Sequence, residues 1–207
     1  MFKLNRGWTA GLSLAGIGSY CVFSENRPFT IQAEEKRYGN KMKVIKSTPD
    51  GNCLFRSVSM GLYNTEDQHI NLRSQAVHWM RNNLDTEIEK GLLLKHTLAL
   101  DEITGEMTEN ERRTQVENYL KRMGHIGIWG DYNCIVALSR CLKPETNFKI
   151  AILSNNSYGK KRGQRKIDSI VDVKSPSLTP EQRTVWLAFN PLNQHYDLIV
   201  FVDERAR

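Results

Sequence analysis

The sequence lacks the closely spaced ligand pairs that mark zinc sites, since it contains no Cys-x-x-Cys pair and no His-x-x-x-His cluster. It also lacks a disulfide framework, because the four cysteines are widely spaced in a chain of 207 residues, long enough to bury a core without cross-links. No internal repeat and no low-complexity tract occurs. Apolar residues make up 40% and charged residues 25%, close to the average of soluble globular proteins. Together these features exclude a zinc module, a disulfide-stapled peptide and a fibrous or wholly disordered protein.

Acidic residues are missing from the N-terminal segment, where the first one is Glu25. Lys3 and Arg6 precede an uncharged, glycine-rich stretch over residues 7–24, which is short for a stable membrane span. This profile is typical of a signal, an anchor or a mitochondrial presequence, and equally of a flexible extension. We predict an N-terminal extension with a linker over residues 1–41 and a folded domain over residues 42–207. A cytoplasmic location is expected for that domain, and a membrane role of the extension stays open.

The predicted elements separate helices from strands along the chain. Helices are predicted from Cys53, after capping boxes that begin at Thr65 and Thr108, and after Asp131 as an N-cap, while residues 85–107 are mixed, with a short helix and loops. The helix after Thr65 is expected to bury Ile70. Strands rich in β-branched and aromatic residues are predicted over residues 42–46, 149–153, 167–173, 184–189 and 196–202. Helices first and most strands later favour an α+β fold, a sheet packed among helices, over a repeating βαβ fold.

The segment from Asp50 to Ser57, DGNCLFRS, delivers Cys53 from a turn to the first position of an amphipathic helix. Free backbone N–H groups and the helix dipole favour negative charge there, so the pKa of a thiol is expected to fall and its nucleophilicity to rise. The same N–H groups can bind the oxyanion of a tetrahedral intermediate, and Gly51 allows the tight turn that aims them. Cys53 is therefore a candidate nucleophile, the alternative being a small apolar residue that opens a helix. Cys134 and Cys141 are predicted to be buried side chains.

A second segment, His195-Tyr196-Asp197, opens the last predicted strand after a loop. Residues i and i+2 of a strand share a face, so Asp197 can orient the ring of His195 and stabilise its protonated form. A thiol nucleophile needs such a base and such an orienting acid. Taken alone, a histidine beside an aspartate at a strand edge is also ordinary surface chemistry.

The two segments together resemble the ovarian-tumour (OTU) family of cysteine proteases. DGNCLFRS is similar to the family's nucleophile motif, and His195-Tyr196-Asp197 followed by an apolar strand is similar to its histidine motif. Between them, Trp129-Gly130 before a helix resembles the family's central tryptophan–glycine segment, although Asp131 departs from the small residue often found there. The resemblance spans roughly residues 43–203 and implies an OTU-like, papain-like fold with a mixed sheet.

The resemblance implies a deubiquitinase, a thiol hydrolase of isopeptide bonds at the C-terminal glycine of ubiquitin or polyubiquitin. Cys53 would be the nucleophile, His195 the general base and then acid, and Asp197 the orienting residue. The resemblance places the backbone N–H of Asp50 in the oxyanion hole. Asn52 would shape the same loop and Trp129 would lie near the channel for the substrate's C-terminal glycines. No metal or organic cofactor is required by this chemistry.

Two alternatives stay open from the sequence. One is a binding module that holds ubiquitin or nucleic acid without cleavage, and the other is a protease for a ubiquitin-like modifier or a polyprotein. The positively charged run over residues 160–166 is interpreted as a solvated loop or as a contact for an acidic surface of the substrate. Nucleic acid is not expected as a partner, because no ladder of aromatic residues accompanies the basic residues. Those basic residues are Lys160, Lys161, Arg162, Arg165 and Lys166.

Overall fold

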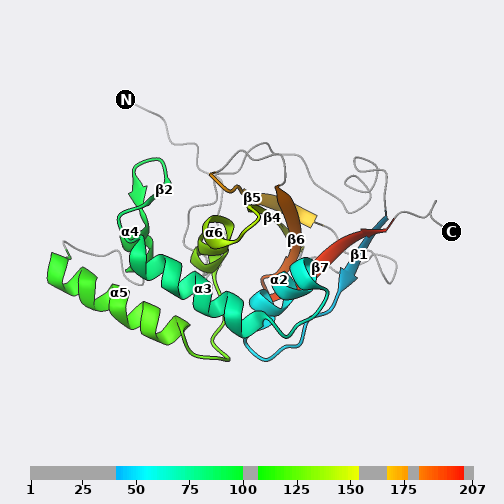
Figure 1. Ribbon diagram of the computed structural model, residues 1–207, viewed down its shortest axis with the longest axis horizontal. Helices are drawn as coiled ribbons and strands as arrows, with labels where there is room; N and C mark the ends of the chain where they lie inside the picture. The colour runs from blue at the N-terminus through cyan, green and yellow to red at the C-terminus, as the bar shows by residue number, and fades with distance from the viewer. Residues whose placement is uncertain (1–40, 100–106, 154–166, 177–181, 203–207) are drawn as a thin grey trace, which may run out of the picture.

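The computed structural model describes residues 41–99, 107–153, 167–176 and 182–202. Its central feature is a five-stranded sheet with helices packed against it (Figure 1). The predicted N-terminal extension, apart from Lys41, and the basic run over residues 160–166 lie outside the described residues. Among the described residues, we find no helix with the length and apolar character that a membrane crossing would require.

The sheet is mixed and has the strand order β1-β7-β6-β4-β5. Its members are β1 (Lys41–Ile45), β4 (Thr146–Leu153), β5 (Ile167–Val173), β6 (Arg183–Asn190) and β7 (His195–Val202). Strands β4 and β6 are parallel, and every other neighbouring pair is antiparallel. Because β1 pairs with β7, the residues just before the predicted nucleophile turn lie beside the strand that begins with His195. This pairing brings together the two segments that carry the candidate catalytic residues.

The helices precede most of the strands, as the sequence predicts. The longer ones are α2 (Cys53–Tyr63), α3 (His69–Asn82), α5 (Glu109–Met123) and α6 (Tyr132–Cys141). A short hairpin of β2 (Glu87–Glu89) and β3 (Leu92–Leu93) leads into α4 (Leu94–Leu98). The predicted α+β fold class, a mixed sheet packed among helices, is confirmed.

The main core lies between the helices and one face of the sheet. Alternation along β6 places Val185, Leu187 and Phe189 in this core and sends Trp186 and Ala188 to a smaller apolar cluster on the opposite face. From α2, the apolar side chains with no solvent exposure are Leu54, Phe55 and Val58. Helix α2 is therefore fixed directly on the sheet, and its first residue has little freedom to move relative to β7.

Local sequence signals correctly predict where two helices begin. The capping box at Thr108 is present, with hydrogen bonds in both directions to Glu111, and it opens α5. The side chain of Asp131 accepts a hydrogen bond from the backbone N–H of Cys134 and caps α6. Cys134 is buried and Cys141 is partly buried, so the predicted burial holds fully only for Cys134.

Two predictions for α3 are wrong. The Thr65 hydroxyl donates to Asp67 instead of capping the helix, which begins four residues later at His69. Ile70 is 50% exposed, because α3 turns the face of Leu72, Arg73, Ala76 and Met80 toward the core. At helical spacing Ile70 lies off this buried face, and the apolar pattern alone does not reveal which face packs inward.

Candidate active site

The nucleophile turn is held in an unusual backbone shape. Gly51 has φ +80°, a left-handed conformation that favours glycine. A Cβ atom at Gly51 would lie 1.8 Å from the carbonyl oxygen of Gly127. The turn therefore packs backbone to backbone against the loop before Trp129, and the next residues, Asn52 and Cys53, start α2.

Replacing Gly51 by alanine should lower the free energy of unfolding by about 2 kcal/mol or more, from left-handed strain together with the clash at Gly127. Gly91 is a matched control, because its φ is +77° but a Cβ there would meet nothing within 4 Å. Gly91→Ala should therefore cost only about 1 kcal/mol of strain. Equilibrium urea unfolding of both variants measures the difference, and equal losses would contradict the close packing at Gly51.

Cys53 is the first residue of α2 and is only 3% exposed. Burial raises the pKa of the Cys53 thiol above the ordinary value, and the backbone N–H groups of Tyr196 and Leu54, which lower this pKa, do not offset the effect of burial. The predicted fall in the pKa of Cys53 is therefore wrong for this structure. At neutral pH the buried thiol is largely protonated, so its reaction requires a base.

The imidazole of His195 provides a base with a defined tautomer. Its Nε2 atom lies 3.1 Å from Oδ1 of Asp197 and 3.3 Å from Oγ of Ser47. A carboxylate can only accept, and the Ser47 hydroxyl already donates to the carbonyl of Tyr196, so Nε2 must carry the hydrogen. In the neutral ring, Nδ1 therefore holds the lone pair that can receive a proton.

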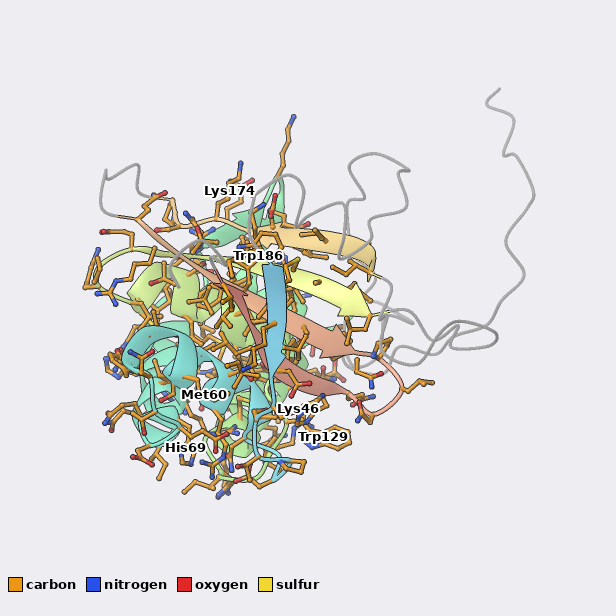
Figure 2. All side chains as sticks on the ribbon, turned by 90° about the vertical axis from the view of Figure 1, so that its right-hand side faces the viewer. Lys46, Met60, His69, Trp129, Lys174 and Trp186 are labelled. Carbon is orange, nitrogen blue, oxygen red and sulfur yellow. The ribbon has the colours of Figure 1, made fainter. Side chains whose placement is uncertain are left out.

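Asp197 is placed to orient that ring. Its side chain is 2% exposed and accepts hydrogen bonds from the backbone N–H of Ser47 at 3.1 Å and from the ammonium group of Lys46. Lys46 follows the last residue of β1, which pairs with Leu198, so strand register brings it to Asp197 (Figure 2 shows Lys46 at the end of β1). Sequence reasoning missed Lys46 and Ser47, because only the pairing of β1 with β7 reveals this contact.

The backbone of Tyr196 joins the two halves of the site. Its carbonyl accepts hydrogen bonds from the hydroxyls of Ser57 at 3.1 Å and Ser47 at 2.6 Å, and its N–H lowers the pKa of the Cys53 thiol. Through Ser57, helix α2 is thus fastened to the residue that lies between His195 and Asp197. Two segments that are far apart in the sequence meet here.

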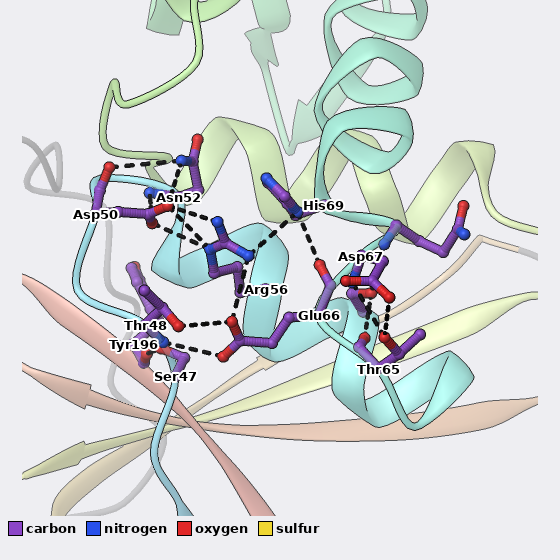
Figure 3. A network of polar contacts seen from close by, with 12 residues as sticks. Ser47, Thr48, Asp50, Asn52, Arg56, Thr65, Glu66, Asp67, His69 and Tyr196 are labelled. Carbon is purple, nitrogen blue, oxygen red and sulfur yellow. Dashed lines mark hydrogen bonds and ion pairs between the residues drawn. The ribbon is translucent and has the colours of Figure 1, made fainter.

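Asp50 occupies a polar network just before the start of α2 (Figure 3). Its carboxylate accepts hydrogen bonds from Arg56 and from the backbone and side chain of Asn52, and these hold its pKa well below the ordinary value. Arg56 also pairs with Glu66, whose carboxylate binds Thr48 at the start of the turn. The backbone N–H of Asp50 donates to the carbonyl of Thr48 at 3.1 Å. In this conformation the N–H of Asp50 is therefore hydrogen-bonded within the turn.

Asn52 and Trp129 lie near the contact between the nucleophile turn and the loop that precedes Trp129. The buried amide of Asn52 accepts a hydrogen bond from the backbone N–H of Gly127 at 2.9 Å. Trp129 is 54% exposed and stands at the surface (Figure 2). A Cβ atom at Gly130 would lie 2.7 Å from the side chain of Leu54, so the tryptophan–glycine segment packs on the residue after Cys53. Trp129 is therefore beside the start of α2.

A metal centre finds no support in the described part of the chain, where no group of three or more histidine, cysteine or acidic residues could hold an ion. The chemistry available at the site is that of a thiol, an imidazole and a carboxylate, with first-turn N–H groups of α2 nearby.

Comparison with known proteins agrees with the resemblance of the sequence to the OTU family. The family model described as "OTU-like cysteine protease" matches residues 48–196. Protein L96 of Tipula iridescent virus, which carries the name of a ubiquitin thioesterase, is 32% identical over 136 residues, covering 64% of this chain and 14% of that protein. OTU domain-containing protein 1 of Mus musculus is 27% identical over 153 residues, covering 73% of this chain and 26% of its own length. The chain thus spans a small part of these relatives.

Solved structures share the fold. The OTU domain of OTUD1 has a TM-score of 0.54 at 22% identity, covering 82% of this chain and 91% of that one. The Hazara virus OTU, solved bound to ubiquitin, has a TM-score of 0.55 at 17% identity, covering 86% and 88%. With a family model that matches more than half of its length and includes both Cys53 and His195, this chain belongs to the OTU-like cysteine protease family.

Proposed function

We propose that this chain is a deubiquitinase, a cysteine-type hydrolase that cleaves the isopeptide bond at the C-terminal glycine of ubiquitin. The observation that carries the proposal is the hydrogen bond between His195 and Asp197 on β7, together with the bond from Ser57 to the carbonyl of Tyr196 between them, which ties this pair to the helix that begins at Cys53. Family membership and the names of the viral relatives support the same chemistry. The Hazara virus structure with ubiquitin supports the choice of substrate. In this proposal residues 42–207 form the catalytic domain.

The proposed reaction has an acylation and a hydrolysis stage. Nδ1 of His195 takes the thiol proton as the sulfur of Cys53 attacks the glycine carbonyl, forming a C–S bond and an oxyanion. First-turn N–H groups of α2, that of Cys53 among them, face the developing charge, and the N–H of Asp50 joins them if its bond to Thr48 opens. The imidazolium then protonates the departing lysine amine as the C–N bond breaks. Water, deprotonated by His195, hydrolyses the thioester and restores the thiol. Asp197 stabilises the imidazolium throughout.

Cleavage of ubiquitin carrying a fluorescent amine on its C-terminal carboxyl tests the proposal. Wild-type chain should release the fluorophore, and Cys53→Ala should lower the rate by at least about 10⁴-fold, because no other nucleophile replaces the thiol. Cys134→Ala is the matched control, since this buried cysteine should be dispensable for catalysis. Binding of ubiquitin without turnover would contradict the proposal and support a binding module. Release from a ubiquitin-like modifier alone would transfer the chemistry to another substrate.

A further inference from the structure

Arg73 is the largest fully buried side chain among the described residues, with 2% exposure. Its guanidinium lies over the ring of Phe55, 4.3 Å from the centroid. Among the described residues no carboxylate lies within ion-pair distance of this group, and Nε has no hydrogen-bond acceptor. A buried cation without a counter-ion is costly. The contacts of Arg73 indicate which structural task offsets this cost.

The acceptors of Arg73 come from two separate segments. Nη2 donates to Oδ1 of Asn52 at 2.9 Å and to the carbonyl of Gly51 at 3.4 Å, both in the nucleophile turn. Nη2 also donates to the carbonyl of Ile128, and Nη1 to the carbonyl of Met123. These last two carbonyls bracket the loop that leads to Trp129. One rigid, planar group therefore connects the turn before Cys53 with both ends of that loop.

The same contact is reinforced from the loop side. Gly127, with φ +87°, donates its N–H to Oδ1 of Asn52, so this oxygen receives hydrogen bonds from both the loop and Arg73. The loop over residues 124–130 contains no helix or strand of its own. Without Arg73, little besides Asn52 and the close approach of Gly51 to Gly127 would fix it on the turn.

We propose that Arg73 is a positioning residue: it clamps the nucleophile turn to the loop that carries Trp129, and so sets the substrate channel relative to Cys53. The inference rests on the proposed function and extends it. Arg73 contacts no group that reacts, so it acts on the reaction only by positioning the two segments. Lysine in its place would keep the charge but could not reach both segments with a planar fork. A displacement of about 1 Å between channel and nucleophile costs about 100-fold in rate.

Arg73→Lys is therefore the decisive variant, with Arg81→Lys on the exposed side of α3 as its matched control. We expect the variant to fold, to lower kcat for the fluorescent ubiquitin substrate by about 100-fold, and to alkylate at Cys53 with iodoacetamide within about threefold of the wild-type rate. Amide hydrogen exchange should rise at both the turn and the loop. Equal turnover of Arg73→Lys and wild type, or equal losses of turnover and alkylation, would overturn the inference.

Two further measurements cover the case in which a variant folds poorly. Gly127→Ala strains the loop from its other side and should also lower turnover more than alkylation. In Arg73→Ala, added methylguanidinium should restore turnover, because Arg73 lines a surface pocket of about 450 Å³ together with Ile70, Val77 and Ile126. No rescue at any concentration would count against the clamp. If wild type fails to cleave ubiquitin, the proposed function fails, and hydrogen exchange of Arg73→Lys still decides whether Arg73 joins the two segments.

Discussion

Replacing His195 by glutamine should lower kcat for ubiquitin hydrolysis by about 10⁴-fold, because the thiol of Cys53 then has no base and the departing amine no acid. Burial raises the pKa of Cys53, so the free thiol is protonated at neutral pH. The residual rate of the variant should therefore increase about tenfold for each pH unit between 7 and 9, as the thiolate fraction rises with pH. Steady-state kinetics across that range measures both effects.

The matched control for this variant is His78→Gln, which alters an exposed histidine on α3. Its kcat should equal that of wild type. A His195→Gln variant that retains more than about a tenth of wild-type turnover would remove His195 from the mechanism, since a positioned general base contributes at least about 100-fold.

The second large effect is expected at Asp197, where alanine should lower kcat by about 10²- to 10⁴-fold. Alanine removes the oxygen that fixes Nε2–H of His195 and leaves Lys46 and the N–H of Ser47 without their acceptor. Asparagine should cost much less. Ser47 and His195 both donate to Oδ1, so an amide oxygen can take that place while the exposed Lys46 turns to water. Kinetics of both variants tests this order.

Asp172→Ala provides the control, because this carboxylate pairs with Lys149 on the surface and its loss should change neither turnover nor folding appreciably. If asparagine and alanine at position 197 lost the same activity, the negative charge of Asp197 would be its essential property, and the role of Oδ1 as an acceptor would be wrong.

The local parts of this site could be predicted from the sequence. Gly51 marks the sharp turn, Cys53 falls at the first position of the expected helix, and the spacing of His195 and Asp197 on a strand places them on one face. Each of these inferences depends on residues within a few positions of each other. The predicted N-caps at Thr108 and Asp131 are correct for the same reason.

What the sequence could not supply depends on tertiary structure. Lys46 reaches Asp197 only through the register of β1 on β7, and Arg73 reaches the nucleophile turn only because α3 faces it inward. The direction of the shift in the pKa of Cys53 was predicted wrongly, because the helix start is local information while burial is a property of the whole fold. The cap expected at Thr65 failed because α3 begins only at His69, so the backbone N–H that the Thr65 hydroxyl accepts is that of Asp67, in the turn before the helix.

The central claim is that the sulfur of Cys53 attacks the ubiquitin C-terminus with the help of His195. Ubiquitin bearing an electrophile at its C-terminus, followed by peptide mass mapping, tests it most directly. We expect one adduct per chain, located on Cys53, with labelling absent in Cys53→Ala and slowed strongly in His195→Gln. An adduct on Cys134 or Cys141, or equal labelling of wild type and Cys53→Ala, would contradict the account.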